Sequence, residues 1–399
     1  MTDQAARAAT TRHSTRAIAL LAAAAFVSTA TVRVADPLLP QIAHDFAVTP
    51  AAASIIATSA ALAYGLFQVL YGSLGDRFGK FTVIAIATAL SALSTAAAAL
   101  ADDLSLLGAL RFVSGGTAAA VVPLAIAHIG DVVPYRQRQA VLARFLSGQI
   151  LGALFGQAFG GLFADRFGWR GIFLVLGALY LVIDALLWLE LGAGRVVDSR
   201  MPEARFRALP ARYVAVLRPA RVRGLLAIVA AEGFLFFGGL TYLGAFAHDA
   251  FGLSFTAIGL VLGCFGLGGF LYSMTARLFV GAFGERRMAL TGGALLALAF
   301  GGVAAAPVWW AMAPAVIAAG FGFYMHHNTL QTNATQMAPE ARGLAISLFA
   351  FTFFLSQAAG VASYGALLGI VGYRGLFVAI AALLPALAVV FASTLLKPR

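Results

Sequence analysis

Charged residues are scarce in this chain. Only 11% of its 399 residues are Asp, Glu, Lys or Arg, and 61% are hydrophobic. A soluble globular domain carries about 25% charged and about 45–50% apolar residues. A water-soluble protein of this size would therefore lack the polar side chains needed to cover its surface. In lipid every backbone polar group must be bonded internally, so the composition predicts an all-α integral membrane protein.

Cysteines and nucleotide-binding motifs are as scarce as charge. A single cysteine, Cys264, excludes a disulfide framework or a cysteine metal cluster. The sequence contains no phosphate-binding loop of the form G-x-x-x-x-G-K-[ST]. No polar segment is long enough to form a separate catalytic domain. We therefore expect no enzyme activity, no cofactor and no bound metal.

The formal net charge of +11 lies in short connections and not on a basic face, so a nucleic-acid partner is not expected. Short cytoplasmic connections collect Lys and Arg. With a cytoplasmic N-terminus, the cytoplasmic connections hold Arg77, Lys80, Arg136 and Arg138, together with the arginine-rich stretch near position 200. This asymmetry predicts a multi-pass protein of the cell (inner) membrane with both termini cytoplasmic.

Long apolar runs fill most of the chain. A helix needs roughly 20 apolar residues to cross the bilayer core. On that scale twelve spans are expected, at 17–36, 51–71, 81–100, 104–128, 139–162, 171–189, 222–246, 255–275, 288–306, 309–331, 342–369 and 373–395. The expected units are a disordered cytoplasmic tail (1–16), an N-terminal six-helix bundle (17–190), a basic cytoplasmic linker (191–221), a C-terminal six-helix bundle (222–396) and a tail (397–399).

The two bundles are related in sequence. Residues 138–173 align without gaps on residues 342–377, at a spacing of 204 positions. The clearest match is Phe-Gly-Trp-Arg-Gly-Ile-Phe at 167–173 against Val-Gly-Tyr-Arg-Gly-Leu-Phe at 371–377. Internal repeats of this kind are typical of secondary transporters. The duplication predicts two pseudo-symmetric halves.

A glycine-rich charged turn, residues 72–80, connects the second and third expected spans. It resembles the G-x-x-x-D-R-x-G-R-K motif found at this place in the major facilitator superfamily of secondary transporters. The resemblance implies two six-helix bundles that rock about a midplane cavity, and a functional monomer in the lipid bilayer. It also implies a cytoplasmic gate, in which Asp131 is expected to pair with Arg77. The residues of this cytoplasmic gate motif are Gly72, Gly75, Asp76, Arg77, Gly79, Lys80 and Asp131.

Three further stretches resemble the drug/proton antiporter branch of that superfamily. The first span ends with Arg33 and Asp36 before Pro37, and the fourth contains Arg111, for which the resemblance implies a role in proton coupling. We expect Arg33, Asp36 and Arg111 to take part in proton coupling. Arg33 and Asp36 are three residues apart, so they can pair on one helix face, either in a cavity or at the outer membrane edge. The fifth span carries a glycine stripe in which Gln157 replaces the branch's proline: Gly148, Gly152, Gly156, Gln157, Gly160 and Gly161.

Glu232 is the strongest candidate for a proton site. It lies about ten residues into the seventh span, which at about 1.5 Å per residue places it near the middle of the membrane. No cation within four residues can pair with it. Ionisable residues at this depth mark functional sites. The alternative is a structural glutamate that is neutral or bonded to another helix.

Other polar residues within the spans are candidates for the cavity. His326 and His327 lie in the tenth span, and histidine titrates near physiological pH. Adjacent side chains on a helix point in different directions, so we expect at most one of the two to face the cavity. The alternative is hydrogen bonding between helices near the membrane surface. The remaining candidates are Tyr64, Gln68, Gln149 and Gln357.

Together these features predict a proton-coupled antiporter that exports small amphipathic molecules by alternating access, with a small-molecule substrate and protons as partners. One alternative is a proton-coupled importer or facilitator of a specific metabolite, which a more polar cavity would favour. Another is a non-transporting membrane sensor or scaffold, which a large soluble appendage would favour.

Overall fold

The computed structural model describes residues 3–192, 194, 209–338 and 341–396. Every regular element in these ranges is a helix. Most of the expected linker (195–208) and of the C-terminal tail (397–399) lies outside the described residues. In chain order the helices are α1 (Asp3–Arg33), α2 (Ala35–Asp45), α3 (Pro50–Ala53), α4 (Ile55–Phe78), α5 (Lys80–Ala98), α6 (Leu104–Ala118), α7 (Val121–Val132), α8 (Tyr135–Gly192), α10 (Leu209–Leu217), α11 (Ala220–Leu240), α12 (Leu243–Phe251), α13 (Phe255–Ala305), η1 (Trp309–Ala311), α14 (Met312–Ala334) and α15 (Arg342–Thr394).

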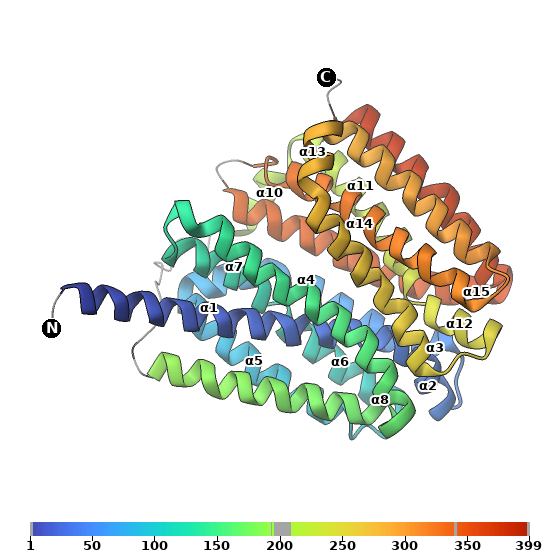
Figure 1. The fold of residues 1–399 in the computed structure, drawn as a ribbon, viewed down its shortest axis with the longest axis horizontal. Coiled ribbons are helices and arrows are strands. Elements are labelled where there is room, and N and C mark those ends of the chain that lie inside the picture. The colour runs from blue at the N-terminus through green and yellow to red at the C-terminus, as the bar shows by residue number, and fades with distance from the viewer. Residues whose placement is uncertain (1–2, 193, 195–208, 339–340, 397–399) are drawn as a thin grey trace.

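The N-terminal segment differs from its expectation. Residues 1–16 were expected to form a disordered tail, but α1 begins at Asp3 and continues to Arg33. Alanine, the strongest helix former, recurs through this segment. Helix α1 therefore extends beyond its neighbours at the N-terminal end (Figure 1).

Glycines with positive φ separate the longest helices. Gly168 has φ 71° and ψ 167°, and Gly372 has φ 65° and ψ 175°. Gly284, inside α13, has φ 67° and ψ 169°. This backbone region is open essentially only to glycine. Glycine therefore recurs at the turn of both sequence repeats because the chain reverses there, between two helices, in a conformation that other residues do not adopt.

The helices are long and apolar enough for a membrane protein. Across the described ranges, nine helical segments meet the length and hydropathy expected of a membrane span. Two of them, Arg144–Gly192 and Gly343–Thr394, contain the breaks at Gly168 and Gly372, so each is long enough to cross twice. Helix α14 adds 23 residues. These helices show a multi-pass membrane fold, and the number of twelve crossings stays a prediction.

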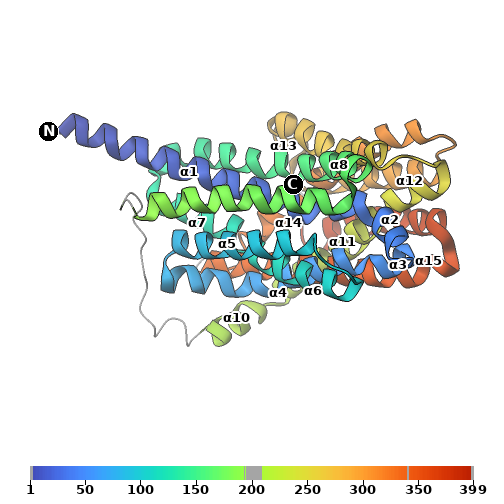
Figure 2. The ribbon, with the colours of Figure 1, turned by 90° about the horizontal axis from the view of Figure 1, so that it is seen from below.

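The helices form two groups that lie side by side. Figures 1 and 2 show α1 to α8, in blue to green, beside α11 to α15, in yellow to red. We call them the N half and the C half. Contacts between the halves run mainly through α8 with α13 and through α4 with α15. Helices α2, α3 and α12 meet at one end of the molecule (Figure 1), and we call this end the α2/α12 end.

The same polar framework supports both halves at the α2/α12 end. Trp169 Nε1 donates a hydrogen bond of 2.9 Å to Asp45, and Tyr373 Oη donates one of 3.0 Å to Asp249. Each aromatic residue follows the glycine of its turn by one position. The arginines that come next bind carbonyl oxygens, Arg170 that of Ala101 at 3.0 Å and Arg374 that of Ala306 at 3.1 Å. The sequence Ala-His-Asp occurs at 43–45 and again at 247–249, a signal that sequence reasoning missed.

At the α2/α12 end, a carboxylate of the N half binds the backbone of the C half. Asp165 accepts backbone hydrogen bonds from Phe255 at 3.1 Å and from Thr256 at 2.6 Å. These N–H groups begin α13, where an acidic group is favoured by the helix dipole. Beside them, Gly161 approaches the Phe255 backbone so closely that a Cβ would overlap its carbonyl oxygen. The halves are therefore held together at the end opposite the Gly72–Lys80 turn.

Candidate functional site

The centre of the C half is a buried carboxylate held by two histidines. Glu232 in α11 is 0% exposed. Its Oε1 lies 2.8 Å from Nδ1 of His326, and its Oε2 lies 2.7 Å from Nδ1 of His327. An ionised carboxylate only accepts hydrogen bonds, so both Nδ1 atoms carry the proton when Glu232 is charged. Three titratable groups thus share one hydrogen-bonded cluster, which we call the Glu232 cluster.

Glu232 is bonded to another helix, which was the alternative considered for it, whereas the expectation that the two histidines point to different sides was wrong. Glu232 has no cation near it in sequence, but α14 supplies two partners from 94 and 95 residues away. Adjacent histidines were expected to point to different sides, yet both reach Glu232. The physical reason is that a carboxylate has two oxygens, each of which meets one ring. The sequence offered a signal only in the pairing of two rare residue types inside apolar spans.

The two histidines differ in their surroundings. His327 stacks on Phe323 with ring centroids 4.8 Å apart, and its side chain is 13% exposed. His326 is 1% exposed and packs edge-on against Phe391. Its Nε2 has no hydrogen-bond partner in the described part of the chain. His327 is therefore the most exposed member of the cluster, and His326 is the member enclosed in the C half.

The N half carries a different set of buried charges. Arg111 in α6 is 1% exposed, and its Nε donates a hydrogen bond of 3.2 Å to the carbonyl oxygen of Ile56. Asp36 in α2 is 3% exposed. The groups that act on its carboxyl are Arg33, Gln157, Arg111 and Thr241. The structure thus brings together Arg33, Asp36 and Arg111, the three N-half residues predicted for proton coupling.

The expected direct pair between Arg33 and Asp36 does not form. The Cζ atom of Arg33 lies 3.8 Å from the ring centroid of Phe237 in the C half. In the described residues no ion pair within 4.0 Å joins Arg33 to a carboxylate. The guanidinium lies over this ring although Val34, between the two residues, keeps the helical φ of −63° and ψ of −25°.

The glycine stripe of α8 packs against α1. A Cβ on Gly148 would lie 2.8 Å from the carbonyl oxygen of Ala22, and one on Gly152 or Gly156 would overlap the next carbonyls along α1. Gly160 meets Val34 and Pro37. Such spacing lets two helix backbones approach closely. Gln157 is 0% exposed and is among the groups that act on Asp36.

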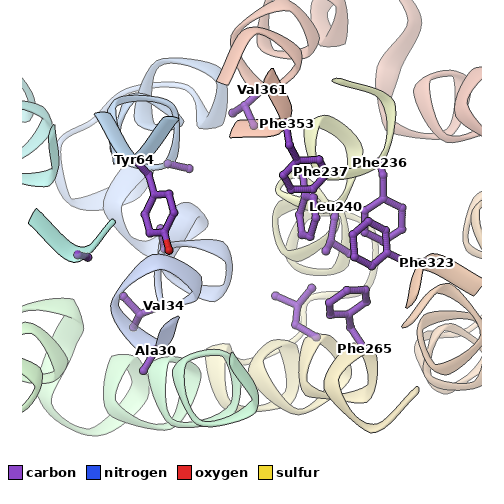
Figure 3. Close-up of a cluster of buried hydrophobic side chains, with 14 of the residues drawn as sticks. Ala30, Val34, Tyr64, Phe236, Phe237, Leu240, Phe265, Phe323, Phe353 and Val361 are labelled. Carbon is purple, nitrogen blue, oxygen red and sulfur yellow. The ribbon is translucent and has the colours of Figure 1, made fainter. Parts of the chain in front are cut away.

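The other candidate cavity residues are Tyr64, Gln68, Gln149 and Gln357. Tyr64 packs on Phe354 across the halves, with ring centroids 4.2 Å apart. Gln68 and Gln357 are buried, and the Oε1 atom of each has no partner in the part of the chain described. Gln149 is half-buried. In Figure 3, Tyr64 and Val34 face a group of rings that includes Phe237 and Phe353. The surroundings are mainly aromatic.

The cytoplasmic gate motif is organised around Lys80. Its Nζ lies 2.7 Å from Asp131 and 3.5 Å from Asp76. Asp131 was expected to pair with Arg77, but its partner is Lys80. Gly79, with φ 97° and ψ 130°, turns the chain so that Lys80 begins α5. Lys80 follows Asp76 by four positions, across the end of α4 at Phe78, and Asp131 reaches it from the end of α7.

Comparison with known proteins decides the family. The sequence profile of the Major Facilitator Superfamily matches residues 21–340 and 246–399. The chain belongs to the Major Facilitator Superfamily. It is 30% identical over 148 residues to the niacin transporter NiaP of Acinetobacter baylyi, covering 37% of this chain and 34% of the relative. It is 24% identical over 226 residues to a bicyclomycin resistance protein homolog of Haemophilus influenzae, covering 55% and 56%.

These relatives are matched over about half their length or less. A solved structure of a D-xylose–proton symporter superposes with a TM-score of 0.74 at 17% identity, covering 96% of this chain and 98% of that one. At this identity the likeness shows the fold alone. The superfamily assignment and the apolar helices make the protein a multi-pass membrane protein.

Proposed function

We propose that this transporter is a proton-coupled antiporter that exports small amphipathic molecules by alternating access. The observation that carries the proposal is the Glu232 cluster, in which a fully buried carboxylate shares hydrogen bonds with two imidazoles. Histidine changes charge between about pH 5 and 8. A proton gained or lost by this cluster alters the charge buried in the C half, which favours one arrangement of the halves over another.

The path of the proton follows from exposure. His327 has the most exposed side chain of the cluster, at 13%, so we assign the entry and exit of the proton to it. Glu232 joins its ring to that of His326. In the N half, Asp36 is a second buried acid, with Arg111 and Gln157 beside it. We assign proton coupling to Glu232 first and to Asp36 and Arg111 second.

Direction and topology belong to the same proposal. The aromatic surroundings favour an amphipathic substrate over a sugar-like one, which needs many polar partners. The names of the relatives include a niacin transporter and a bicyclomycin resistance protein, so they support both import and export. The positions of Lys and Arg support an inner-membrane protein with both termini in the cytoplasm. We further propose that the protein functions as a monomer.

The test is reconstitution in liposomes with a dye that reports internal pH. Ethidium, tetraphenylphosphonium and benzoate serve as probes under an imposed pH gradient. We expect at least one probe to drive proton movement opposite to its own, and Glu232→Gln to abolish that movement. Asp184→Asn is the matched control, because Asp184 is a buried carboxylate away from the cluster. Full coupling in Glu232→Gln, or protons that move with the probe, would contradict the proposal.

A further inference from the structure

Arg33 is a guanidinium without a partner at the contact between the halves. It is half-buried, and in the described residues no carbonyl, hydroxyl or carboxylate accepts a hydrogen bond from it. A guanidinium has five N–H donors in a planar fork. Buried charges are ordinarily paired, since removing one from water without a partner is costly. The donors of Arg33 are therefore available to an anion that is not part of the protein.

The groups around Arg33 are aromatic. Phe237 lies under the guanidinium at 3.8 Å. The other ionisable groups that act on it are Asp36, Tyr64 and Tyr324. Phe237 is itself surrounded by rings, with Phe323 at 5.2 Å and Phe353 at 5.6 Å between centroids. Figure 3 shows these phenylalanines together in the C half, opposite Tyr64. A ligand held by Arg33 therefore meets rings on the side of the C half.

The balance of the buried charges around Arg33 favours the binding of an anion. Arg33 and Arg111 supply two positive charges, and Asp36 supplies one negative charge. Gln157, Thr241 and the two arginines act on the carboxyl of Asp36, which is not within ion-pair distance of Arg33 among the described residues. The group as a whole thus keeps an excess of one positive charge beside an apolar wall.

We propose that Arg33 and Phe237 form a binding site for an aromatic monocarboxylate, with the carboxylate on the guanidinium fork and the ring among the C-half phenylalanines. A planar fork matches a carboxylate in two parallel hydrogen bonds. One arginine and an aromatic wall suit an organic monoanion better than inorganic phosphate, which prefers several donors. The proposal rests on the proposed transport function and specifies its substrate class.

The position of the site couples binding to transport. Arg33 ends α1 in the N half, and Phe237 belongs to α11 in the C half. A ligand that touches both is bound most tightly in the arrangement that brings them together. Five residues before Phe237 on the same helix is Glu232. Occupancy of the site and protonation of the Glu232 cluster therefore act on one helix.

Binding is tested on the purified protein in detergent, independently of transport. Benzoate, benzamide and benzylamine have similar shapes and carry a negative charge, no charge and a positive charge. We expect benzoate to raise the temperature of thermal unfolding and to bind about tenfold or more tightly than benzamide, as a charged hydrogen bond implies. Benzylamine should not bind. Arg33→Gln should remove the preference for benzoate, and Phe237→Leu should weaken benzoate and benzamide alike.

Controls separate a lost site from a lost fold. Arg33→Lys keeps the charge but not the fork, so it should retain part of the preference for benzoate. Arg221→Gln removes an exposed arginine of α11 and should change nothing. Equal binding of benzoate and benzamide to the native protein would overturn the proposal, as would native benzoate binding by a folded Arg33→Gln variant. Displacement of benzoate by equimolar inorganic phosphate would show a general anion site and overturn the aromatic assignment.

The failure of this site and the failure of proton coupling give different results. If benzoate binds through Arg33 but moves no protons in liposomes, the site stands and the coupling does not. If another probe drives proton movement through Glu232 while benzoate fails to bind, the coupling stands and this site is wrong.

Discussion

The two halves share one framework and differ in the charges placed inside it. Asp45 and Asp249 lie 204 positions apart, as do Trp169 and Tyr373, and each acid accepts a hydrogen bond from the aromatic residue of its own half. The close contacts between the halves follow the same symmetry. Gly161 packs on Phe255, and Gly365 packs on Ala51, again 204 positions apart. Duplication is thus retained where the backbone must fit.

The interior charges do not follow the duplication. At the same spacing, the counterpart of Arg33 is Phe237, the ring on which it lies, and the counterpart of Asp36 is Leu240. The counterpart of Glu232 is Ser28, which donates a hydrogen bond to the carbonyl oxygen of Ala118. Each half has one buried acid near its first long helix, but the N half surrounds it with arginine and the C half with histidine.

This difference predicts that the basic residues around the buried acid change their charge with pH only in the C half. Arginine stays charged in proteins, whereas histidine gains and loses its proton near neutral pH. The arginines of the N half provide a fixed field. The histidines of the C half provide a variable one. The predictions that follow test this contrast, beginning with the largest effect.

Replacement of His326 should have the largest effect. His326→Leu leaves one oxygen of Glu232 without its donor in a fully buried site, which is expected to cost about 3–5 kcal/mol of stability and to abolish coupled transport. His326→Gln keeps a donor but cannot take a proton. It should therefore remain folded, while the pH dependence of transport flattens. Thermal unfolding and liposome flux between pH 5 and 8 measure the two effects.

The matched change in the N half is Arg111→Gln. Because arginine does not titrate in this range, Arg111→Gln should lower transport without changing the shape of its pH profile. An unchanged profile in His326→Gln, or a flattened profile in Arg111→Gln, would show that the contrast between the halves is wrong.

The fold was predictable because apolar runs and repeated turns are local signals. The Phe-Gly turn at 167–168 can be recognised from sequence, since only glycine adopts its backbone. The Glu232 cluster was not predictable, because its partners lie 94 and 95 residues away and the choice of Nδ1 over Nε2 depends on packing. The direction of Arg33 was missed for a related reason. Its contact with Phe237 joins residues 204 positions apart, and a long side chain can turn either to Asp36 on its own segment or to the other half.

The second contrast concerns the cytoplasmic turns. In the N half, Asp76 lies 3.5 Å from Lys80, which also binds Asp131. In the degenerate C-half turn, Glu285 accepts a hydrogen bond of 3.2 Å from the amide of Asn333. We expect Asp76→Asn to lower the transport rate several-fold and Glu285→Gln to have little effect, because only the first change removes a charge from an ion-pair network. Liposome flux measures both, and equal losses would contradict the assignment of a gate to Gly72–Lys80.

The smallest predicted effects concern the duplicated framework. Tyr373→Phe deletes only the hydroxyl that donates to Asp249, at the exposed side of the α2/α12 end. Its cost in stability should be about 1 kcal/mol, the ordinary value for one hydrogen bond. Trp169→Phe removes the donor to Asp45 and also part of a ring that is 0% exposed, so a cavity adds to the loss. The midpoint temperature of thermal unfolding should be lower for Trp169→Phe than for Tyr373→Phe, and both variants should keep proton coupling. A loss of coupling in either variant would mean that this framework takes part in the transport cycle. The duplicated residues would then serve transport as well as stability.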